Sequence, residues 1–487
     1  MNKKLKIAFV SSEVAPFSKT GGLADVSGAL PQAIKKLGHE VKIFTPQYKS
    51  ISENVPNLEN VFKNLEIPIL NYMRPCELNK SLLGNTEIFF IKNNDLFFRE
   101  GLYGSKDGDY LDNAERFIFF NKAVIESLIK MNFQPDIIHI NDWQTGLIPA
   151  YIKVLKMYED FFANTKFVFT IHNIGYQGLF WHFDMPLTGL PWEIFNINGI
   201  EYYGKISFLK AGIVYSDLVT TVSKKYAQEI QTPEYGHGFE GILQSVSHKL
   251  IGILNGVDYS EWNPETDPII AKNYSIKKLS GKNTCKKDLL KYFKLKYEKD
   301  IPVIGMITRL TVQKGIDILM PILEDILNNN DVYFTILGSG DVKYENFFKE
   351  IKEKIPEKVG LYIGYNNELA HKIEAGADMF LMPSLYEPCG LNQMYSLKYG
   401  TVPIVRATGG LDDTIENITI DNNNVTGTGF KFQNYSSDEL YSTIIKALDT
   451  YKNKKIWEQI IKNGMQKDYS WNTSAKEYVK NYLKLFQ

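Results

Sequence analysis

Short apolar runs rich in β-branched and aromatic residues recur along the whole chain and constrain its fold most strongly. In the first half they occupy residues 6–11, 41–46, 87–92, 136–141, 166–172 and 217–223. In the second half they occupy residues 251–256, 302–308, 332–338, 360–365, 378–383 and 402–407. Nearly continuous apolar strands that alternate with helical periodicity are typical of parallel sheets covered by helices on both faces. The sequence therefore predicts an α/β, doubly wound fold.

The number of these runs also predicts how the chain divides. A chain of 487 residues is too long for one compact core, and this many strands exceed what a single doubly wound sheet usually holds. We expect two sheets, with a break in the turn-rich stretch 255–268 and a mobile, lysine-rich surface helix or loop over residues 269–300. The predicted domains are residues 1–250, joined by a C-terminal helix at 466–487, and residues 251–465. Since open α/β sheets bind ligands at the carboxyl ends of their strands, we expect the chemistry in a cleft between these domains.

Composition narrows the class of protein and its partners. The net charge of −1 gives no global attraction to nucleic acid or to an anionic membrane. The three cysteines, Cys76, Cys285 and Cys389, lie far apart and form no CxxC pair, which favours a reducing compartment. The apolar patch after the first lysines covers only residues 7–10, too short for a signal peptide, and no stretch reaches membrane-spanning length. We therefore expect a cytoplasmic protein with no nucleic-acid or membrane partner.

The stretch SKTGGLAD, residues 18–25, places Lys19 just before a predicted helix start. A helix N-terminus favours anions, so a cation there is misplaced unless an anionic ligand binds beside it. Gly21 and Gly22 would let such a ligand approach the backbone closely. The alternative is a glycine turn with a solvated lysine. The similar stretch ATGGLDDT, residues 407–414, suggests that both halves use a Gly-Gly turn into a helix.

Two loops of the second half carry further charged residues. TRLTVQKG ends a predicted strand and places Arg309 and Lys314 where a diphosphate could bind; an ordinary solvated basic loop is the alternative. EPCGLNQM follows the strand at 378–383 and carries Glu387, which could accept hydrogen bonds from substrate hydroxyls or stabilise developing positive charge. Its alternative role is to cap a helix. Backbone N–H groups of residues 390–392 could meet a phosphate.

Polar residues also follow two strands of the first half. HINDWQTG places Asp142 and Trp143 after one strand, and FTIHNIGYQG places His172 and Asn173 after another. A lone histidine is more often structural than catalytic, but two polar pairs at neighbouring strand ends favour a site. The sequence has no HExxH spacing, no GxSxG elbow, no P-loop motif and no GxGxxG after the first strand. We therefore expect neither a metal site nor serine hydrolysis, P-loop chemistry or ordinary NAD binding.

These segments together resemble the bacterial glycogen synthase and plant starch synthase family, which are retaining glycosyltransferases of the GT-B fold. The resemblance covers nearly the whole chain and rests on ten segments in the family's order: EVAPFSKTGGLADVSGALP, DNAERFIFF, HINDWQTGL, TIHNIGYQGLF, FLKAGIVYSDLVTTVS, YGHGFEGIL, ILNGVDYSEWNPETD, TRLTVQKG, EPCGLNQM and ATGGLDDT. It implies two Rossmann-like domains with a catalytic cleft between them. It also implies transfer of glucose, with retention, from ADP-glucose to the 4-hydroxyl at the non-reducing end of an α-1,4-glucan, with no metal or other cofactor.

The resemblance further implies roles for individual residues. The implied donor-binding residues are Lys19, Gly21, Gly22, Tyr103, Arg309, Lys314, Cys389, Gly390 and Leu391. The implied catalytic residues are Glu387, Lys314, Arg309, His172 and Asp142, and the implied glucose and acceptor side is formed by Asn173, Asp142 and Trp143. Position 395 is Tyr, where many retaining GT-B enzymes have a second Glu, and this agrees with the synthase subgroup. Both a front-side mechanism and a covalent intermediate are compatible with the sequence.

Other functions on this fold have to be weighed. An enzyme of the same fold could use UDP-glucose or be a granule-associated starch synthase. A catalytically silent glucan-binding scaffold is a different class, against which the intact set of Lys19, His172, Arg309, Lys314 and Glu387 argues. A GT-B phosphorylase would need a pyridoxal-lysine motif, to which nothing in the sequence is similar.

Overall fold

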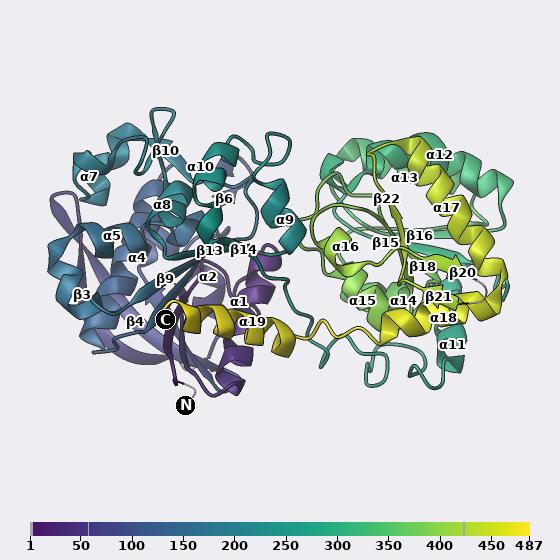
Figure 1. Cartoon of the computed structure of the whole chain (residues 1–487), viewed down its shortest axis with the longest axis horizontal. Helices are drawn as coiled ribbons and strands as arrows, with labels where there is room; N and C mark the ends of the chain where they lie inside the picture. The colour runs from purple at the N-terminus through teal and green to yellow at the C-terminus, as the bar shows by residue number, and fades with distance from the viewer. Residues whose placement is uncertain (1–2, 57, 422–423) are drawn as a thin grey trace. The chain divides into compact units, whose positions relative to one another are not determined.

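The computed structural model describes residues 3–56, 58–421 and 424–487. It forms two compact units, each built on its own sheet, mostly parallel in the first and fully parallel in the second (Figure 1). The first unit comprises residues up to 222, residues 227–256 and residues 471–487, and the second comprises residues 223–226 and 257–470. Parallel sheets with helices on both faces confirm the predicted α/β, doubly wound class.

A nine-stranded sheet forms the centre of the first unit. In spatial order its strands are β14 (Leu250–Gly252), β13 (Leu218–Thr221), β9 (Lys166–Ile171), β8 (Ile137–Asn141), β1 (Lys6–Val10), β2 (Glu40–Pro46), β5 (Thr86–Lys92), β4 (Tyr72–Leu83) and β3 (Glu59–Ile69). Neighbours from β14 to β5 pair in parallel, whereas β5, β4 and β3 pair antiparallel. Smaller sheets join β10 (Leu179–Trp181), β12 (Lys205–Ser207) and β11 (Glu201–Tyr202), and β6 (Gly104–Ser105) and β7 (Gly108–Asp109).

The strand predicted at residues 251–256 joins the sheet of the first unit. The predicted domain boundary placed residues 251–256 in the second domain, but β14 pairs in parallel with β13 at the edge of the first sheet. The first unit accordingly runs to Gly256 rather than to residue 250. The long hairpin of β3 and β4 was not predicted. Its side chains are mostly exposed or half-buried, so it lacks the continuous apolar signal of a buried parallel strand.

The second unit has a six-stranded, fully parallel sheet. In spatial order its strands are β17 (Val359–Ile363), β16 (Tyr333–Gly338), β15 (Val303–Ile307), β18 (Met379–Met382), β19 (Val402–Arg406) and β22 (Phe430–Phe432). β20 (Thr419–Asp421) and β21 (Asn424–Thr426) form a separate hairpin. Successive side chains of a strand point to opposite faces, so Val303 and Ile304 of β15 enter different apolar clusters. Both faces of the sheet are therefore buried.

Helices supply the other side of each buried face. In the first unit they are α1 (Gly22–Lys36), α2 (Lys49–Asn54), α3 (Asn94–Phe97), α4 (Asn113–Lys130), α5 (Ile148–Val154), α6 (Glu159–Phe162), α7 (Met185–Thr188), α8 (Phe208–Tyr215), α10 (Glu240–Ser245) and α19 (Trp471–Lys484). In the second unit they are α11 (Ser280–Tyr292), α12 (Ile316–Asn329), α13 (Val342–Lys354), α14 (Asn367–Gly376), α15 (Asn392–Tyr399), α16 (Gly409–Thr414), α17 (Ser437–Lys452) and α18 (Lys454–Met465). Figure 1 shows α12 and α13 on one side of the second sheet and α14, α15 and α18 on the other.

Helix α11 corrects the expectation for the lysine-rich stretch. Residues 269–300 were predicted to form a surface helix or loop, but Leu289 and Leu290 of α11 are fully buried beside α14. Even two of its lysines, Lys282 and Lys286, are buried. The apolar positions were hidden in the sequence by the lysines around them.

Helix α19 completes the first unit with residues from the far end of the chain. It packs on α1, and the two lie side by side in Figure 1. Its Tyr478 and Tyr482 are fully buried. No helix in the described ranges combines the length and the apolar character needed to cross a bilayer.

Candidate active site

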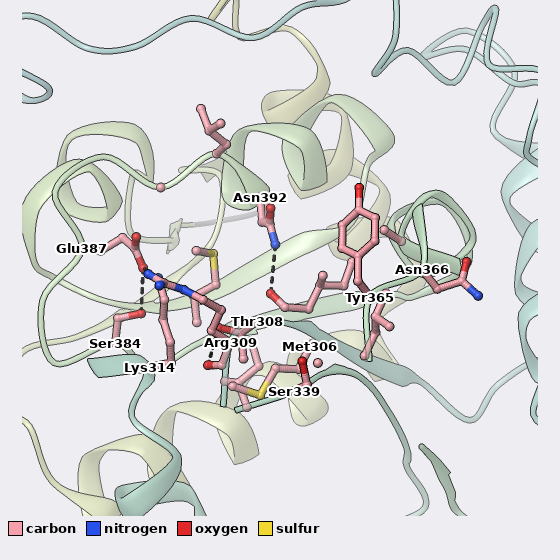
Figure 2. A pocket seen from close by; sticks show the side chains of 18 of the residues that line it. Met306, Thr308, Arg309, Lys314, Ser339, Tyr365, Asn366, Ser384, Glu387 and Asn392 are labelled. Atoms are coloured by element: carbon pink, nitrogen blue, oxygen red, sulfur yellow. Dashed lines mark hydrogen bonds and ion pairs between the residues drawn. The ribbon is translucent and has the colours of Figure 1, made fainter. Parts of the chain in front are cut away.

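A pocket of about 330 Å³ lies at the carboxyl ends of four neighbouring strands of the second unit, β17, β16, β15 and β18. Its polar lining residues are Thr308, Arg309, Lys314, Ser339, Tyr365, Asn366, Ser384, Glu387 and Asn392. In Figure 2, Lys314 and Ser384 converge on Glu387 at one end of this pocket, and Tyr365 and Asn366 lie toward the other. Carboxyl strand ends are the expected ligand position in an open α/β sheet, so we call this hollow the strand-end pocket.

An ion pair organises the charged end of the strand-end pocket. The Nζ of Lys314 lies 2.6 Å from Oε2 of Glu387, and the hydroxyl of Ser384 donates to the same oxygen at 3.0 Å. The two charged side chains are only 16% and 9% exposed. Arg309 is exposed at the pocket rim and leaves its guanidinium open to a ligand. Two cations and one carboxylate leave the site a net positive charge.

Backbone packing brings the two charged loops together. Gly315, directly after Lys314, has a φ of +71°, and a Cβ there would lie 2.0 Å from the carbonyl oxygen of Pro383. The amide of Leu385 donates to the carbonyl of Gln313 at 2.9 Å. Only glycine permits this close approach, and it places Lys314 beside the loop that carries Glu387.

The glycine pair at the start of α16 supports the Glu387 loop from behind. The amide of Gly410 donates to the carbonyl of Glu387 at 3.0 Å. A Cβ on Gly409 would lie 1.9 Å from that carbonyl oxygen, and one on Gly410 would lie 1.9 Å from the carbonyl of Cys389. Cys389 is buried, and Gly390 has a φ of +70° that turns the loop toward α15. The ATGGL turn therefore shapes the site without facing the pocket.

The matching glycine pair of the first unit has different surroundings. Gly21 is the N-cap of α1 and Gly22 its first residue, and a Cβ on either would meet nothing within 4 Å. Lys19 is half-exposed, and its Nζ lies 2.6 Å from Oδ1 of Asp25 in the first turn of α1. The Asp25 carboxylate offsets part of the unfavourable interaction between Lys19 and the positive end of the helix dipole. The open space leaves room for a ligand at the backbone.

Glu13 fixes the loop that carries Lys19. Its carboxylate accepts from the amide and the hydroxyl of Thr20, at 2.5 and 2.6 Å, and from the hydroxyl of Tyr103 at 2.7 Å. The buried Arg116 donates to the carbonyl of Leu102 at 3.0 Å and so positions the loop of Tyr103. Tyr103 is thus placed beneath the KTGGL loop, where its hydroxyl is already occupied.

The strand ends of β8 and β9 bring Asp142 and His172 together. Oδ1 of Asp142 accepts from the amide of His172 at 2.7 Å, and Nε2 of His172 donates to Oδ1 of Asn141 at 3.0 Å. Asp142 has a φ of +54° and a ψ of −179°, a conformation rare for residues other than glycine. Such strain concentrates at functional sites, because the surroundings have to maintain it. Asn173 is half-buried and its Oδ1 accepts from the amide of Gly175 at 2.9 Å.

Burial shifts the pKa values of both residues. Desolvation raises the pKa of the Asp142 carboxyl to about 7, a shift that its backbone hydrogen bond from His172 opposes. Desolvation lowers the pKa of His172 to about 3, so its imidazole is neutral at physiological pH. Because Nε2 holds the proton toward Asn141, Nδ1 is the acceptor nitrogen. The pair therefore offers hydrogen-bonding groups without a fixed positive charge.

Comparisons with known proteins identify the family. Residues 6–245 match the family model described as the starch synthase catalytic domain, and residues 290–466 match that of glycosyl transferases group 1. The chain is 49% identical over 484 residues to a glycogen synthase of Koribacter versatilis, with 99% of each chain covered. The chain belongs to the glycogen synthase and starch synthase family. A glycogen synthase of Thermosipho melanesiensis is 48% identical over 483 residues, again with 99% of each chain covered.

Solved structures support the same assignment for this family member. The catalytic domain of starch synthase IV from Arabidopsis thaliana, solved with ADP and acarbose, superposes with a TM-score of 0.89 at 32% identity over 99% of each chain. A sucrose-phosphate synthase from Thermosynechococcus elongatus, 16% identical with a TM-score of 0.61, shares the fold. The protein therefore has the GT-B fold and is a glycosyltransferase that transfers glucose to an α-1,4-glucan.

The predicted site residues of this glycosyltransferase fall into distinct environments. In the second unit, Arg309, Lys314, Glu387, Gly390 and Leu391 all line the strand-end pocket. In the first unit, Asp142, His172 and Asn173 meet at two adjacent strand ends. Trp143 differs, because it is 9% exposed and packs against the rings of Phe117, Phe180 and Phe208. Its place is in the core beneath the site.

Sequence reasoning missed several residues of these sites. Glu13 holds the loop that carries Lys19, and Ser384 holds Glu387. Asn392 donates to the carbonyl of Ile307 at 3.0 Å across the pocket. Glu13 follows the first buried strand closely in sequence, which is the signal that singled out Asp142 and His172. Ser384 and Asn392 carry no such signal, because serine and asparagine are common in any loop.

Proposed function

We propose that the protein transfers glucose, with retention, from ADP-glucose to the 4-hydroxyl at the non-reducing end of an α-1,4-glucan. The observation that carries this proposal is the cluster of Arg309, Lys314 and Glu387 in one pocket at the carboxyl ends of a parallel sheet. It combines anion-binding cations with a carboxylate suited to a sugar. The Arabidopsis starch synthase IV domain, solved with ADP and acarbose, supports a nucleotide and a glucan as ligands of this fold.

The barrier to transfer lies in breaking the bond between glucose C1 and the diphosphate. Positive charge develops on the glucose ring and negative charge on the leaving diphosphate. We assign Arg309 and Lys314 to the diphosphate and Glu387 to the glucose. Two cations and one carboxylate offer one net positive charge against the two negative charges of a diphosphate, so a further cation is needed, and we assign Lys19 this role. Removing one such preorganised contact typically costs on the order of 10²–10³ in rate.

The residues at the ends of β8 and β9 in the first unit suit a neutral, hydroxylated ligand. In the proposed reaction, Asp142 and Asn173 accept or donate hydrogen bonds to sugar hydroxyls. The Nδ1 of His172 accepts one from a hydroxyl, which its neutral imidazole permits. We propose no step through a metal or other cofactor. A cytoplasmic location remains our expectation from the sequence alone.

A direct assay tests the proposal. The purified protein is given radiolabelled ADP-glucose or UDP-glucose with glycogen or maltooligosaccharide, and the label in the glucan is measured. We expect incorporation from ADP-glucose well above that from UDP-glucose, and release of the new residue by an exo-acting amylase specific for α-1,4 links. Preferential use of UDP-glucose would refute the donor assignment. Binding of glucan with no incorporation from either donor would refute catalysis and favour a scaffold.

A further inference from the structure

The second unit has another pocket, at the opposite ends of its strands. This hollow of about 500 Å³ is lined by Lys299 and Asp300, which precede β15, and by Asp378, which precedes β18. The strand-end pocket lies at the carboxyl ends of the same two strands. The two pockets therefore lie at opposite ends of the same strands, and we call the new one the amino-end pocket.

Lysines dominate the lining of the amino-end pocket. Six lysines and three acidic residues contribute to it: Lys277, Lys282, Lys286, Lys299, Lys454, Lys462, Asp300, Asp378 and Glu458. Close ion pairs join Lys286 to Asp378 at 2.8 Å and Lys462 to Glu458 at 2.6 Å. The remaining acid, Asp300, is 82% exposed and lies 3.9 Å from Lys454. An exposed pair at that distance is weak, so the lining keeps a clear excess of positive charge.

The lysines divide into a structural floor and an open rim. Lys282 donates to the carbonyls of Ala375 and Tyr399 and, at 2.7 Å, to the hydroxyl of Thr401, which uses its three hydrogens. At the rim, Lys277, Lys299 and Lys454 are exposed. Within the described ranges, Lys277 and Lys299 have no ion-pair partner. Lys454 lies over the ring of Tyr451, with its Nζ 3.2 Å from the ring centre. Lys277 and Lys299 are therefore open to a ligand, Lys454 can reach one by leaving this ring, and the floor lysines supply charge below it.

Burial is the main cause of the lowered pKa values of two lysines in the amino-end pocket. Burial lowers the pKa of Lys282 to about 8; Asp378 and Glu374 oppose this shift, and Lys286 makes a smaller contribution that lowers the pKa. Burial also lowers the pKa of Lys454; Asp378 and Asp300 oppose this shift, and repulsion from Lys286 and Lys299 adds to it. A bound anion would relieve this repulsion and stabilise the charged lysines.

Backbone dipoles act in the same direction. The first turn of α11 lines the pocket through Ser280 and Asn283, and its N-cap, Leu279, makes no side-chain capping hydrogen bond. The first turn of α18 lines it through Lys454 and Trp457, and its N-cap Asn453 already accepts from the amide of Ile456 at 3.3 Å. Two helix N-termini at one hollow add partial positive charge to that of the lysines.

We propose that the amino-end pocket binds a small organic phosphate with at least two negative charges. Lys277, Lys299 and Lys454 would contact the phosphate oxygens, and the exposed carboxylates of Asp300 and Glu458 would accept from hydroxyls of the organic part. The volume suits a metabolite rather than a polymer. This site is separate from the proposed transfer reaction and does not depend on it.

Calorimetric titration of the whole chain tests the site, with fructose 1,6-bisphosphate and inorganic phosphate as probes. The test variant is K299Q/K454Q, and the matched control is K287Q/K455Q, which removes two exposed lysines of α11 and α18 outside the pocket. We expect the bisphosphate to bind the wild type and the control equally, and the test variant at least roughly ten-fold more weakly. Binding should persist in K314Q, in which the strand-end pocket is impaired.

Several results would overturn the proposal. Absence of binding to the wild type would remove the site. Equal weakening in both double variants would show diffuse surface charge instead of a pocket. Loss of binding in K314Q would place the ligand at the strand-end pocket. Inorganic phosphate binding as tightly as the bisphosphate would refute an organic ligand. All substituted lysines of the double variants are exposed, and unchanged melting temperatures would show that the variants fold.

Discussion

Lys314 and Glu387 show how one residue pair can serve both the resting protein and the reaction. Their 2.6 Å contact is largely shielded from water, so each side chain holds the other in place. A donor diphosphate would draw Lys314 toward its oxygens, while Ser384 continues to hold Glu387. In the proposed reaction, the two charges of this pair would separate onto the diphosphate and the glucose of the donor.

We expect Lys314→Gln to lower turnover by about 10²–10³ with a smaller effect on the KM for ADP-glucose, because a preorganised cation acts mainly on the departing diphosphate. Glutamine removes the charge but keeps a terminal N–H donor, on a side chain one atom shorter than that of lysine. Steady-state kinetics measures the change. The exposed Lys343 on α13 offers a control, since Lys343→Gln removes the same charge away from the pocket. Near-normal turnover of K314Q would contradict the diphosphate role.

Asp142 makes stability depend on pH. Its folded pKa of about 7 lies above its ordinary value of 3.8, so the folded state holds a proton that the unfolded state has released between these limits. Stability contributed by this group therefore falls as pH rises from about 4 to about 7. We expect the free energy of unfolding of Asp142→Asn to rise relative to that of the wild type by on the order of 2–4 kcal/mol as the pH rises over that range. The measurement is the difference in melting temperature between the two proteins, which should grow with pH.

The exposed Asp107 provides the matching control for that pH series. Asp107→Asn removes the same carboxylate without burial, so its melting temperature should follow the wild type at every pH. If the D142N difference also stayed flat with pH, the Asp142 carboxyl would not be shifted in the way its burial implies.

Single residues of the site could be predicted when their chemistry and their position agreed. Arg309, Asp142 and His172 are charged or titratable and directly follow apolar strands, so the strand-end rule identified them. Trp143 has the same position in sequence, but the aromatic rings around it come from distant segments that no local pattern announces. Glu13 accepts hydrogen bonds from Thr20 and Tyr103, and Tyr103 comes near it only in the folded protein, so the sequence did not indicate its role.

At the scale of elements, two nearly identical Gly-Gly turns have opposite environments. Gly21 and Gly22 begin α1 beside open space, whereas Gly409 and Gly410 begin α16 in direct contact with the Glu387 loop. The sequence predicted both helix starts, because the motif itself specifies them. It could not predict the difference, because only the folded protein determines what lies against each turn.

This difference gives a paired prediction. Gly22→Ala should leave the melting temperature unchanged or slightly higher, since alanine favours a helix, yet lower the rate of glucose transfer by blocking close approach of the donor. Gly410→Ala should cost several kcal/mol or prevent folding, because its Cβ would lie 1.9 Å from the Cys389 carbonyl. Thermal unfolding and the transfer assay distinguish the two. Full activity in G22A would show that Gly22 serves the helix start alone.

The strands also show where sequence patterns succeed and fail. Strands buried on both faces, such as β1 and β15, have continuous apolar runs and were predicted within a few residues. Strand β14 was recognised, but its partner was not, because an apolar run does not say which sheet it joins. The exposed hairpin of β3 and β4 was missed for the opposite reason, since its residues alternate with little apolar excess.

At the scale of the whole molecule, a chain of hydrogen bonds ties the C-terminal helix to the sheet of the first unit. The hydroxyl of Tyr482 on α19 contacts Nδ1 of His139 at 2.6 Å, and Nε2 of His139 contacts the hydroxyl of Thr170 at 2.6 Å. The hydroxyl of Thr170 is also hydrogen-bonded to the hydroxyl of Thr220 at 2.6 Å, so this series of hydrogen bonds crosses β8, β9 and β13. Burial lowers the pKa of His139 to about 3, which keeps its imidazole neutral within this network.

We expect Tyr482→Phe to destabilise the protein by about 1–3 kcal/mol, because it leaves a buried nitrogen of His139 without its partner. Tyr48 is an informative control: it is equally buried, and its hydroxyl has no hydrogen-bond partner among the described residues. Tyr48→Phe should therefore be neutral or slightly stabilising. Melting temperatures of the two variants make the comparison, and equal values would show that the network contributes nothing.

The return of α19 to the first unit also sets an order of events during synthesis. The last strand of that unit's sheet, β14, ends at Gly252, but the unit's last helix begins only at Trp471. At typical translation rates, roughly 10–40 s pass between these two points. During that interval the surface of α1 that α19 later covers is exposed in the nascent chain. The second unit can fold to completion first, so the half of the enzyme that is made earliest is finished last.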